Sequence, residues 1–134
     1  SQGANAVLHA SVKGVVSSRI VLLAPLVSVE SHLRRACALV KLSAEGTELF
    51  LRKITELVGV PPSDFEGHVM GSTLNMRTLI VHDCRDKEVP ISEGETLANE
   101  MSLARLHISD GLGHRRLLAD LDTVNQVVSL MNET

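Results

Sequence analysis

The sequence has almost no aromatic residues: two of its 134 residues are phenylalanine, and tryptophan and tyrosine are absent. Proteins that bind single-stranded nucleic acid stack the bases on aromatic side chains, so this platform is missing. The charge offers no substitute, because the net charge is -3 and the pI is about 6.0, whereas phosphate backbones attract basic surfaces. We therefore expect no nucleic-acid partner.

Long apolar runs are missing as well. The runs at residues 20–24 and 78–81 are far shorter than the roughly 18 residues that a membrane span needs. A secretory signal has a charged region followed by an apolar stretch, and the first residues, Ser-Gln-Gly-Ala, show neither. The sequence therefore predicts no membrane association.

Cysteine is scarce, and no metal-binding pattern is present. The two cysteines, Cys37 and Cys84, form no CxxC pair, so we interpret them as free thiols of a cytoplasmic protein. The histidines show neither H-x-x-x-H nor H-x-H spacing. No metal site and no cofactor are expected.

The sequence does contain enough apolar residues for a core. Apolar residues make up 44% of the chain and charged residues 22%, close to the average of globular proteins. A chain of this length buries roughly two-thirds of the surface that its unfolded form exposes. We expect one compact domain.

Three segments have the character of strands in a parallel sheet. Residues 19–24 and 77–82 are continuous apolar runs, which are typical of strands buried on both faces. In residues 104–109, Leu106 and Ile108 alternate onto one face. Because helices alternate with these strands, the sequence predicts an α/β fold with right-handed crossovers.

Residues 28–75, between the first two strands, are predicted to be a helical insertion. Two amphipathic stripes with helical spacing lie within it, and the second ends before a glycine and a Pro-Pro pair. The stripes are Leu33, Ala36, Cys37 and Val40, then Leu49, Phe50, Ile54, Leu57 and Val58.

Further helices flank the strands. Apolar spacing predicts a helix over residues 2–13 that ends at a glycine. Ser92 and Glu95 match an S-x-x-E capping box that would open a helix. A last helix is expected to start near Asp120 or Asp122.

Polar residues gather just after the predicted strands, where parallel sheets collect their ligands. Residues 82–90 read His-Asp-Cys-Arg-Asp-Lys-Glu-Val-Pro, and residues 111–114 read Gly-Leu-Gly-His. The first residues, Ser-Gln-Gly-Ala-Asn-Ala, lead into the first helix.

These three segments resemble motifs of the α/β-hydrolases. In that family, a strand followed by H-G/D-x-x-D-x-x-V-P is followed by a helix, a strand and a G-x-G-H loop. The start of this sequence matches S-x-G-x-x-A, the second half of the nucleophile elbow G-x-S-x-G. The resemblance implies the C-terminal half of an α/β-hydrolase fold, with residues 28–75 as a lid or cap.

The resemblance also implies a catalytic triad in the family's chain order. Ser1 would be the nucleophile, Asp86 the acid and His114 the base. The backbone N–H of Gln2 would be one oxyanion donor, while the second donor belongs to a loop that this sequence does not contain.

On the residues alone, other interpretations stay open. Asp86 is typical of a carboxylate that caps a turn, His114 of a structural loop histidine, and Ser1 of a terminal serine. Asp83 keeps the turn-capping interpretation even under the resemblance, because the family places the acid at the second aspartate.

The expected function is that of a serine hydrolase acting on a small-molecule ester or related acyl compound. Arg115 and Arg116 follow the histidine; a solvated helix start is the simpler interpretation, and contact with an anionic substrate group is the alternative. We expect the chain to be part of a longer enzyme, to be inactive alone and to self-associate through an exposed sheet edge. The alternative function is a catalytically silent α/β-hydrolase-like binding or regulatory protein.

Overall fold

The computed structural model describes residues 2–133 and divides into two compact units. One, here called the sheet unit, combines the residues before Ser28 with those after Glu66. The other, the helical unit, is Ser28–Glu66. Among the described residues, none of the helices is both long and apolar enough to cross a membrane.

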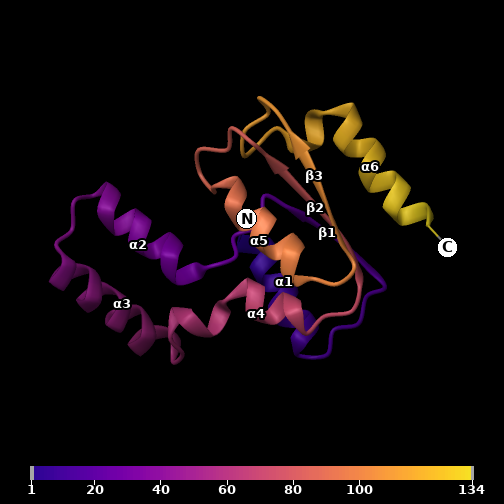
Figure 1. Ribbon diagram of the computed structural model, residues 1–134. Helices are drawn as coiled ribbons and strands as arrows, with labels where there is room; N and C mark the ends of the chain where they lie inside the picture. Colours follow the sequence, from indigo (N-terminus) through magenta and orange to yellow (C-terminus); the bar gives the residue numbers. More distant parts are fainter. Residues whose placement is uncertain (1, 134) are drawn as a thin grey trace. The chain divides into compact units, whose positions relative to one another are not determined.

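The sheet unit is built on a parallel three-stranded sheet with the order β1-β2-β3 (Figure 1). Ile80 in the central strand lies opposite Leu22 on one side and Leu106 on the other. The predicted parallel sheet is confirmed. The strands are β1 (Arg19–Leu23), β2 (Arg77–Asp83) and β3 (Ala104–Ser109).

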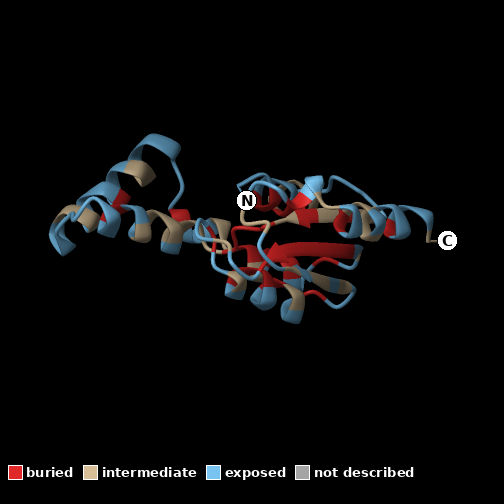
Figure 2. Cartoon of the chain, turned by 90° about the horizontal axis from the view of Figure 1, so that it is seen from above, coloured by how far each residue is buried: buried red, intermediate tan, exposed pale blue. Residues whose placement is uncertain are grey.

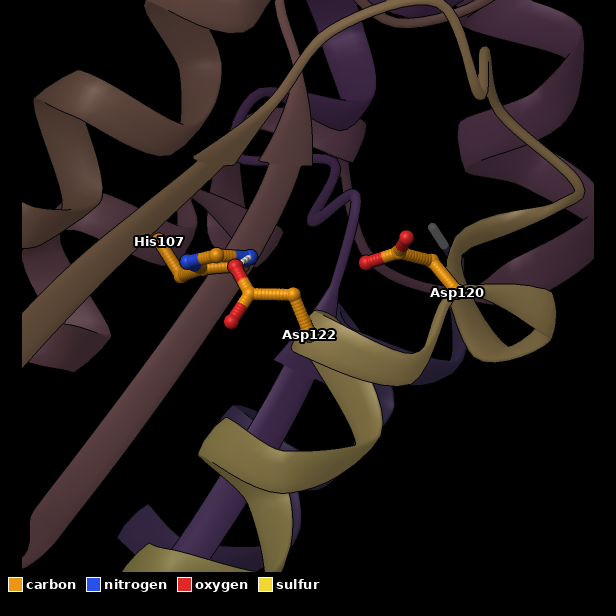
Figure 3. A group of neighbouring side chains, drawn as sticks. All are labelled: His107, Asp120 and Asp122. Atoms are coloured by element: carbon orange, nitrogen blue, oxygen red, sulfur yellow. Dashed lines mark ion pairs between the residues drawn. The ribbon is translucent and has the colours of Figure 1, made fainter.

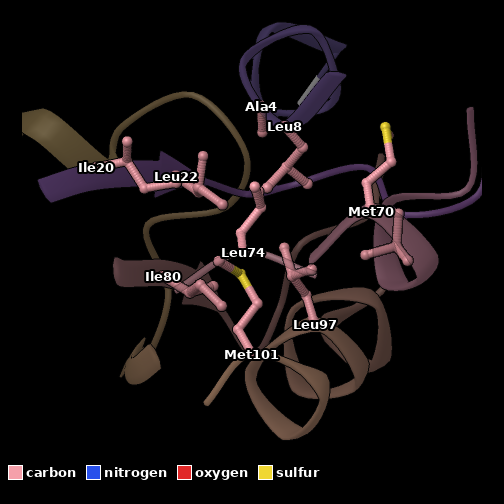
Figure 4. Close-up of a cluster of buried hydrophobic side chains, with 10 residues drawn as sticks. Ala4, Leu8, Ile20, Leu22, Met70, Leu74, Ile80, Leu97 and Met101 are labelled. Carbon is pink, nitrogen blue, oxygen red and sulfur yellow. The ribbon is translucent and has the colours of Figure 1, made fainter. Parts of the chain in front are cut away.

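Three helices cover one face of this sheet. Their apolar side chains meet those of the strands in the cluster of Figure 4, where Leu8 and Leu97 are fully buried. Burying a leucine side chain stabilises a fold by roughly 1.5–3 kcal/mol, so this cluster holds the helices in place. The helices are α1 (Gln2–Val12), α4 (Gly67–Ser72) and α5 (Ile91–Glu100).

Helix α6 (Leu121–Asn132) covers the opposite face, where Leu130 packs with Leu79 and Val81 of β2. A short 3-10 turn, η2 (Leu117–Ala119), precedes it. Alternate residues of β1 reach the two clusters, as expected for a strand covered by helices on both sides. The buried residues of the sheet, red in Figure 2, belong to β1 and β2, whereas the residues of β3 are partly or fully exposed.

The helical unit contains the two amphipathic helices that the sequence predicts. Ser28 and Ser43 accept hydrogen bonds from backbone N–H groups in the first turns, and the second helix ends at Gly59 with φ of 84°. The unit comprises α2 (Val29–Leu39), α3 (Ala44–Val58) and the 3-10 turn η1 (Pro62–Phe65). A lid function for residues 28–75 stays a prediction.

The sheet unit holds the two ends of this insertion side by side. Gly67 donates its backbone N–H to the carbonyl oxygen of Val27 at 2.6 Å. A Cβ at Gly67 would lie 3.2 Å from both the Cα and the oxygen of Val27, so a side chain would press on this contact. The carboxylate of Glu93 accepts a further hydrogen bond from the N–H of Val27 at 2.8 Å.

The predicted capping box at the start of α5 is wrong. The helix begins at Ile91 with Pro90 in the capping position, and no side chain caps it. Ser92 therefore lies inside the first turn, where its hydroxyl cannot take the capping role. Proline is compatible with a helix start because its fixed φ suits that position.

Helix α5 approaches β2 closely at Gly94. A Cβ at this position would lie 2.6 Å from Nδ1 of His82, closer than real Cβ contacts allow. Gly94 and His82 are both buried. The glycine therefore allows α5 to lie this close to β2.

We expect Gly94→Ala to destabilise the protein by about 1–3 kcal/mol, because overpacking outweighs alanine's better helix propensity of about 1 kcal/mol. Urea unfolding measures the change. Gly3→Ala is the matched control: it is also helical, and a Cβ there meets nothing within 4 Å. Equal stability of the two variants would contradict the close packing.

Candidate active site

Asp86 and His114 meet at the carboxyl ends of two neighbouring strands. Asp86 lies on the loop after β2, and His114 lies on the loop after β3. Nδ1 of His114 is 2.7 Å from Oδ2 of Asp86. The Asp86 side chain is fully buried, while that of His114 is 15% exposed. The structure thus brings together an acid and a histidine that are 28 residues apart.

The surroundings of Asp86 keep it ionised. Its Oδ1 accepts hydrogen bonds from the N–H groups of Glu88 at 2.8 Å and Val89 at 2.9 Å. Burial raises the pKa of Asp86, but hydrogen bonds from the Val89 N–H, the His114 ring and the Glu88 N–H together hold the pKa below its ordinary value. A carboxylate at this position keeps the proton of a neutral His114 on Nδ1 and leaves Nε2 as the base.

Of the other predicted site residues, Gln2 is the first residue of α1, and its side chain is exposed. Ser1 lies outside the described residues. The triad and oxyanion roles of Ser1, Gln2, Asp86 and His114 therefore stay predictions.

The sequence analysis gave Asp83 only a local turn-capping role, and the structure shows a wider one. Its Oδ1 accepts the N–H of Arg85 at 2.9 Å, as turn capping predicts. Its Oδ2 accepts the hydroxyl of Ser109 at 2.8 Å and the N–H of Leu112 at 2.9 Å. The carboxylate therefore joins the loop after β2, which carries Asp86, to the loop after β3, which carries His114 and is called the histidine loop below.

Asp83 makes these bonds as a fully buried anion. Burial raises its pKa, but hydrogen bonds from the Leu112 N–H, the Ser109 hydroxyl and the N–H groups of Arg85 and Gly113 lower the pKa to about 2. Several N–H donors on one carboxylate are known to have this effect. The sequence signals were its position directly after a predicted buried strand and its place in the H-G/D-x-x-D motif, and neither reveals the link to the loop after β3.

His82 is a second histidine beside Asp86, to which the sequence analysis gave no role. It is fully buried, and its Nε2 lies 3.0 Å from the oxygen of Val89 and 3.5 Å from Oδ2 of Asp86. A carbonyl oxygen only accepts, so Nε2 carries the hydrogen. Nδ1 has no hydrogen-bond partner among the described residues, on the side where Gly94 approaches.

A second polar group lies on the α6 face of the sheet. In Figure 3, His107 of β3 lies beside Asp120 and Asp122, and their ligand atoms lie within 4.8 Å of one another. Structural roles account for this group: Asp120 caps α6 through the N–H of Thr123 at 2.8 Å, and Asp122 pairs with His107 at 3.5 Å. The positive end of the helix also disfavours a cation, so we assign no metal here.

A pocket of about 370 Å³ opens beside His114. Both loops contribute to it, and its lining is mainly basic and glycine residues. The lining residues are Arg85, Lys87, Glu88, Gly111, Gly113, His114 and Arg116.

Comparisons with known proteins reveal similarity in structure rather than in sequence. No protein-family model and no curated protein matches the chain. Solved structures do match. The chain aligns over 96% of its length with 42% of an acetyl xylan esterase from Paenibacillus sp. R4, at 20% identity and a TM-score of 0.66.

Two further solved structures give the same result. All of the chain aligns with 63% of MGS-M2, an α/β-hydrolase enzyme from a Medee basin deep-sea metagenome library, at 16% identity and a TM-score of 0.67. The fold is that of part of an α/β-hydrolase. An esterase from Exiguobacterium antarcticum matches over 98% of the chain and 65% of its own length, at 14% identity and a TM-score of 0.62. The chain thus spans 42% to 65% of the length of these proteins.

We expect Asp83→Asn to lower the free energy of unfolding at pH 7 by about 1–3 kcal/mol, because it weakens buried hydrogen bonds to a charged acceptor. The folded pKa is about 2, below the ordinary 3.8. The stabilisation from ionised Asp83 is therefore present above about pH 4 and is lost as the pH falls towards 2. Urea unfolding between pH 7 and 2.5 should show the gap to wild type shrinking.

Asp110→Asn is the control for this comparison. Asp110 is exposed and pairs with Arg85 at 2.5 Å on the surface, where an ion pair contributes about 0–1 kcal/mol. A loss in Asp83→Asn no larger than in Asp110→Asn, or a gap that is constant with pH, would contradict the role given to the buried carboxylate.

Proposed function

We propose that this chain forms the C-terminal half of a serine hydrolase that cleaves an ester or a related acyl compound. The observation that carries the proposal is the contact between Asp86 and His114 at 2.7 Å, made at the carboxyl ends of adjacent parallel strands. A buried carboxylate on one ring nitrogen is what a catalytic histidine needs to act as a base through the other. The fold, shared with esterases and hydrolases, is consistent with it.

In the proposed mechanism, Ser1 Oγ attacks the carbonyl carbon of the substrate while Nε2 of His114 takes its proton. Asp86 holds the ring orientation and stabilises the imidazolium that forms. The same proton then passes from His114 to the leaving alcohol, and the acyl group stays on Ser1. Water, activated by His114, releases the acid in the second half of the reaction.

The backbone N–H of Gln2 is proposed as one donor to the oxyanion. A second donor would come from a segment outside this sequence, and the absence of one such donor costs on the order of 10² to 10³ in rate. We therefore expect full activity from a longer protein and little from these 134 residues alone.

Three further parts of the proposal concern the surroundings of the site. Residues 28–75 would act as a lid or cap. The apolar strand β1, at the edge of the described sheet, would pair with a further strand of a longer protein or, in the chain alone, support self-association. A reducing, cytoplasmic location fits two free thiols, one of them the exposed Cys84.

A fluorophosphonate probe tests the nucleophile. The longer protein should be labelled covalently, and Ser1→Ala should abolish the label, because the probe reacts with a serine that an adjacent base activates. Ser11→Ala, on the same helix, is the control and should keep the label. An unlabelled parent protein would contradict the assignment and favour a silent binding protein. Label retained in Ser1→Ala would contradict it by placing the reactive serine elsewhere.

Asp86→Asn tests the acid. The amide cannot stabilise the imidazolium and favours the wrong histidine tautomer, so kcat should fall by up to about 10⁴. Ester hydrolysis by the longer protein measures this loss. Asp122→Asn serves as the control, because Asp122 lies at the start of α6 and pairs with His107 instead. Unchanged turnover in Asp86→Asn would overturn the role of the pair.

A further inference from the structure

The pocket beside His114 has more positive than negative charge. It is lined by three permanently basic side chains, Arg85, Lys87 and Arg116, and by one acidic side chain, Glu88. This excess is opposite in sign to the net charge of the whole chain, which is -3. The local charge therefore does not follow from the composition.

Ion pairs neutralise only some of these groups. Arg85 pairs with Asp110 at 2.5 Å, and Glu88 pairs with Arg115 at 2.9 Å. Among residues 2–133, the Lys87 ammonium has neither an ion pair nor a hydrogen bond. One charge of the pocket thus lacks a protein partner.

Arg116 is the second uncompensated cation. Its Nε donates to the oxygen of Leu112 at 3.1 Å, and its Nη2 donates to the oxygen of Gly111 at 2.5 Å. Carbonyl oxygens orient the guanidinium but do not cancel its charge. Arg116 is therefore held on the histidine loop with its charge intact.

The two glycines of the histidine loop leave room in the pocket. Gly111 has φ of 87° and Gly113 has φ of 64°, a backbone region that favours glycine, and a Cβ at either position would meet nothing within 4 Å. With a volume of about 370 Å³ the pocket lies within the range of small-molecule sites.

From this arrangement we infer that the pocket binds a carboxylate or similar anionic group on the leaving-alcohol part of the ester. The inference rests on the proposed function, in which His114 gives its proton to the leaving alcohol. The group bonded to that oxygen therefore lies next to His114, where Lys87 and Arg116 meet it. The substrate class is an ester whose alcohol part is an anion.

A matched pair of esters tests this with the longer protein. 4-Acetoxybenzoate carries a carboxylate on its leaving group, and phenyl acetate is the neutral counterpart. We expect kcat/KM to be roughly 2- to 10-fold higher for the anion at low salt, and the preference to shrink in 0.5 M NaCl as the charges are screened.

Lys87→Gln and Arg116→Gln should each lower the ratio of the two kcat/KM values by roughly 2- to 5-fold, the size expected for an exposed ion pair. Lys13→Gln is the matched control, since Lys13 lies outside the pocket lining. A parent that hydrolyses phenyl acetate as well as or better than 4-acetoxybenzoate overturns the inference and leaves the hydrolase proposal intact. A ratio unchanged in both pocket variants overturns it too.

A binding measurement separates the pocket from catalysis. In amide NMR spectra of the longer protein, benzoate should shift the signals of Gly111 and Gly113 saturably, benzamide should not, and Lys87→Gln should weaken the benzoate effect. Equal shifts with benzoate and benzamide, or none, would overturn the inference. If benzoate binds in this way but neither ester is hydrolysed, the proposed hydrolase function fails, and the substrate assignment fails with it.

Discussion

The geometry of the candidate site depends on the buried carboxylate of Asp83. It lies at the end of the central strand and accepts donors from its own loop and from the loop after β3, with distances of 2.8 to 2.9 Å. A buried anion is stable only when such donors surround it, so the loops and the carboxylate hold one another. Asp83 thus positions the two loops that carry Asp86 and His114. The hydrogen-bond partners described for it are other residues of these loops and Ser109.

The parallel sheet explains why the loops meet at all. All three strands are parallel, so the loops after β2 and β3 both begin at the carboxyl ends of neighbouring strands. Packing from α5 on one face and α6 on the other fixes the strand ends. The chain in this way brings two distant polar segments into contact without a disulfide among the residues described.

The strands and most helices could be predicted because their signals are periodic and local. Continuous apolar runs are typical of buried strands, as in β1 and β2, and apolar stripes with helical spacing are typical of amphipathic helices, as in α2 and α3. The start of α5 was mispredicted because Pro90 and the Ser92 motif are competing local signals, and the fixed φ of the proline suits the helix start. The positions of Asp86 and His114 followed from motif order, whereas their distance needed the fold.

The linking role of Asp83 and the partners of His82 could not be predicted, because they depend on how α5 and the loop after β3 pack against β2. The partners of Asp83 include Ser109 and Leu112, 26 and 29 residues away, and three of its donors are backbone N–H groups that no side-chain pattern reveals. His82 owes its surroundings to Gly94, whose missing side chain matters only once α5 packs on β2. The motif H-G/D-x-x-D includes both positions, but it does not reveal these contacts.

The hydrogen bond between Val27 and Gly67 joins the two segments of the sheet unit that flank the inserted helical unit. The backbone nitrogen of Gly67 lies 2.6 Å from the oxygen of Val27, and the carboxylate of Glu93 accepts the N–H of Val27. Both contacts lie within the sheet unit itself. The entropy of closing a loop changes only slowly with its length. The segment between Val27 and Gly67 can thus be exchanged for one of different length and sequence, in evolution or by engineering, while the sheet and the loops after β2 and β3 are retained.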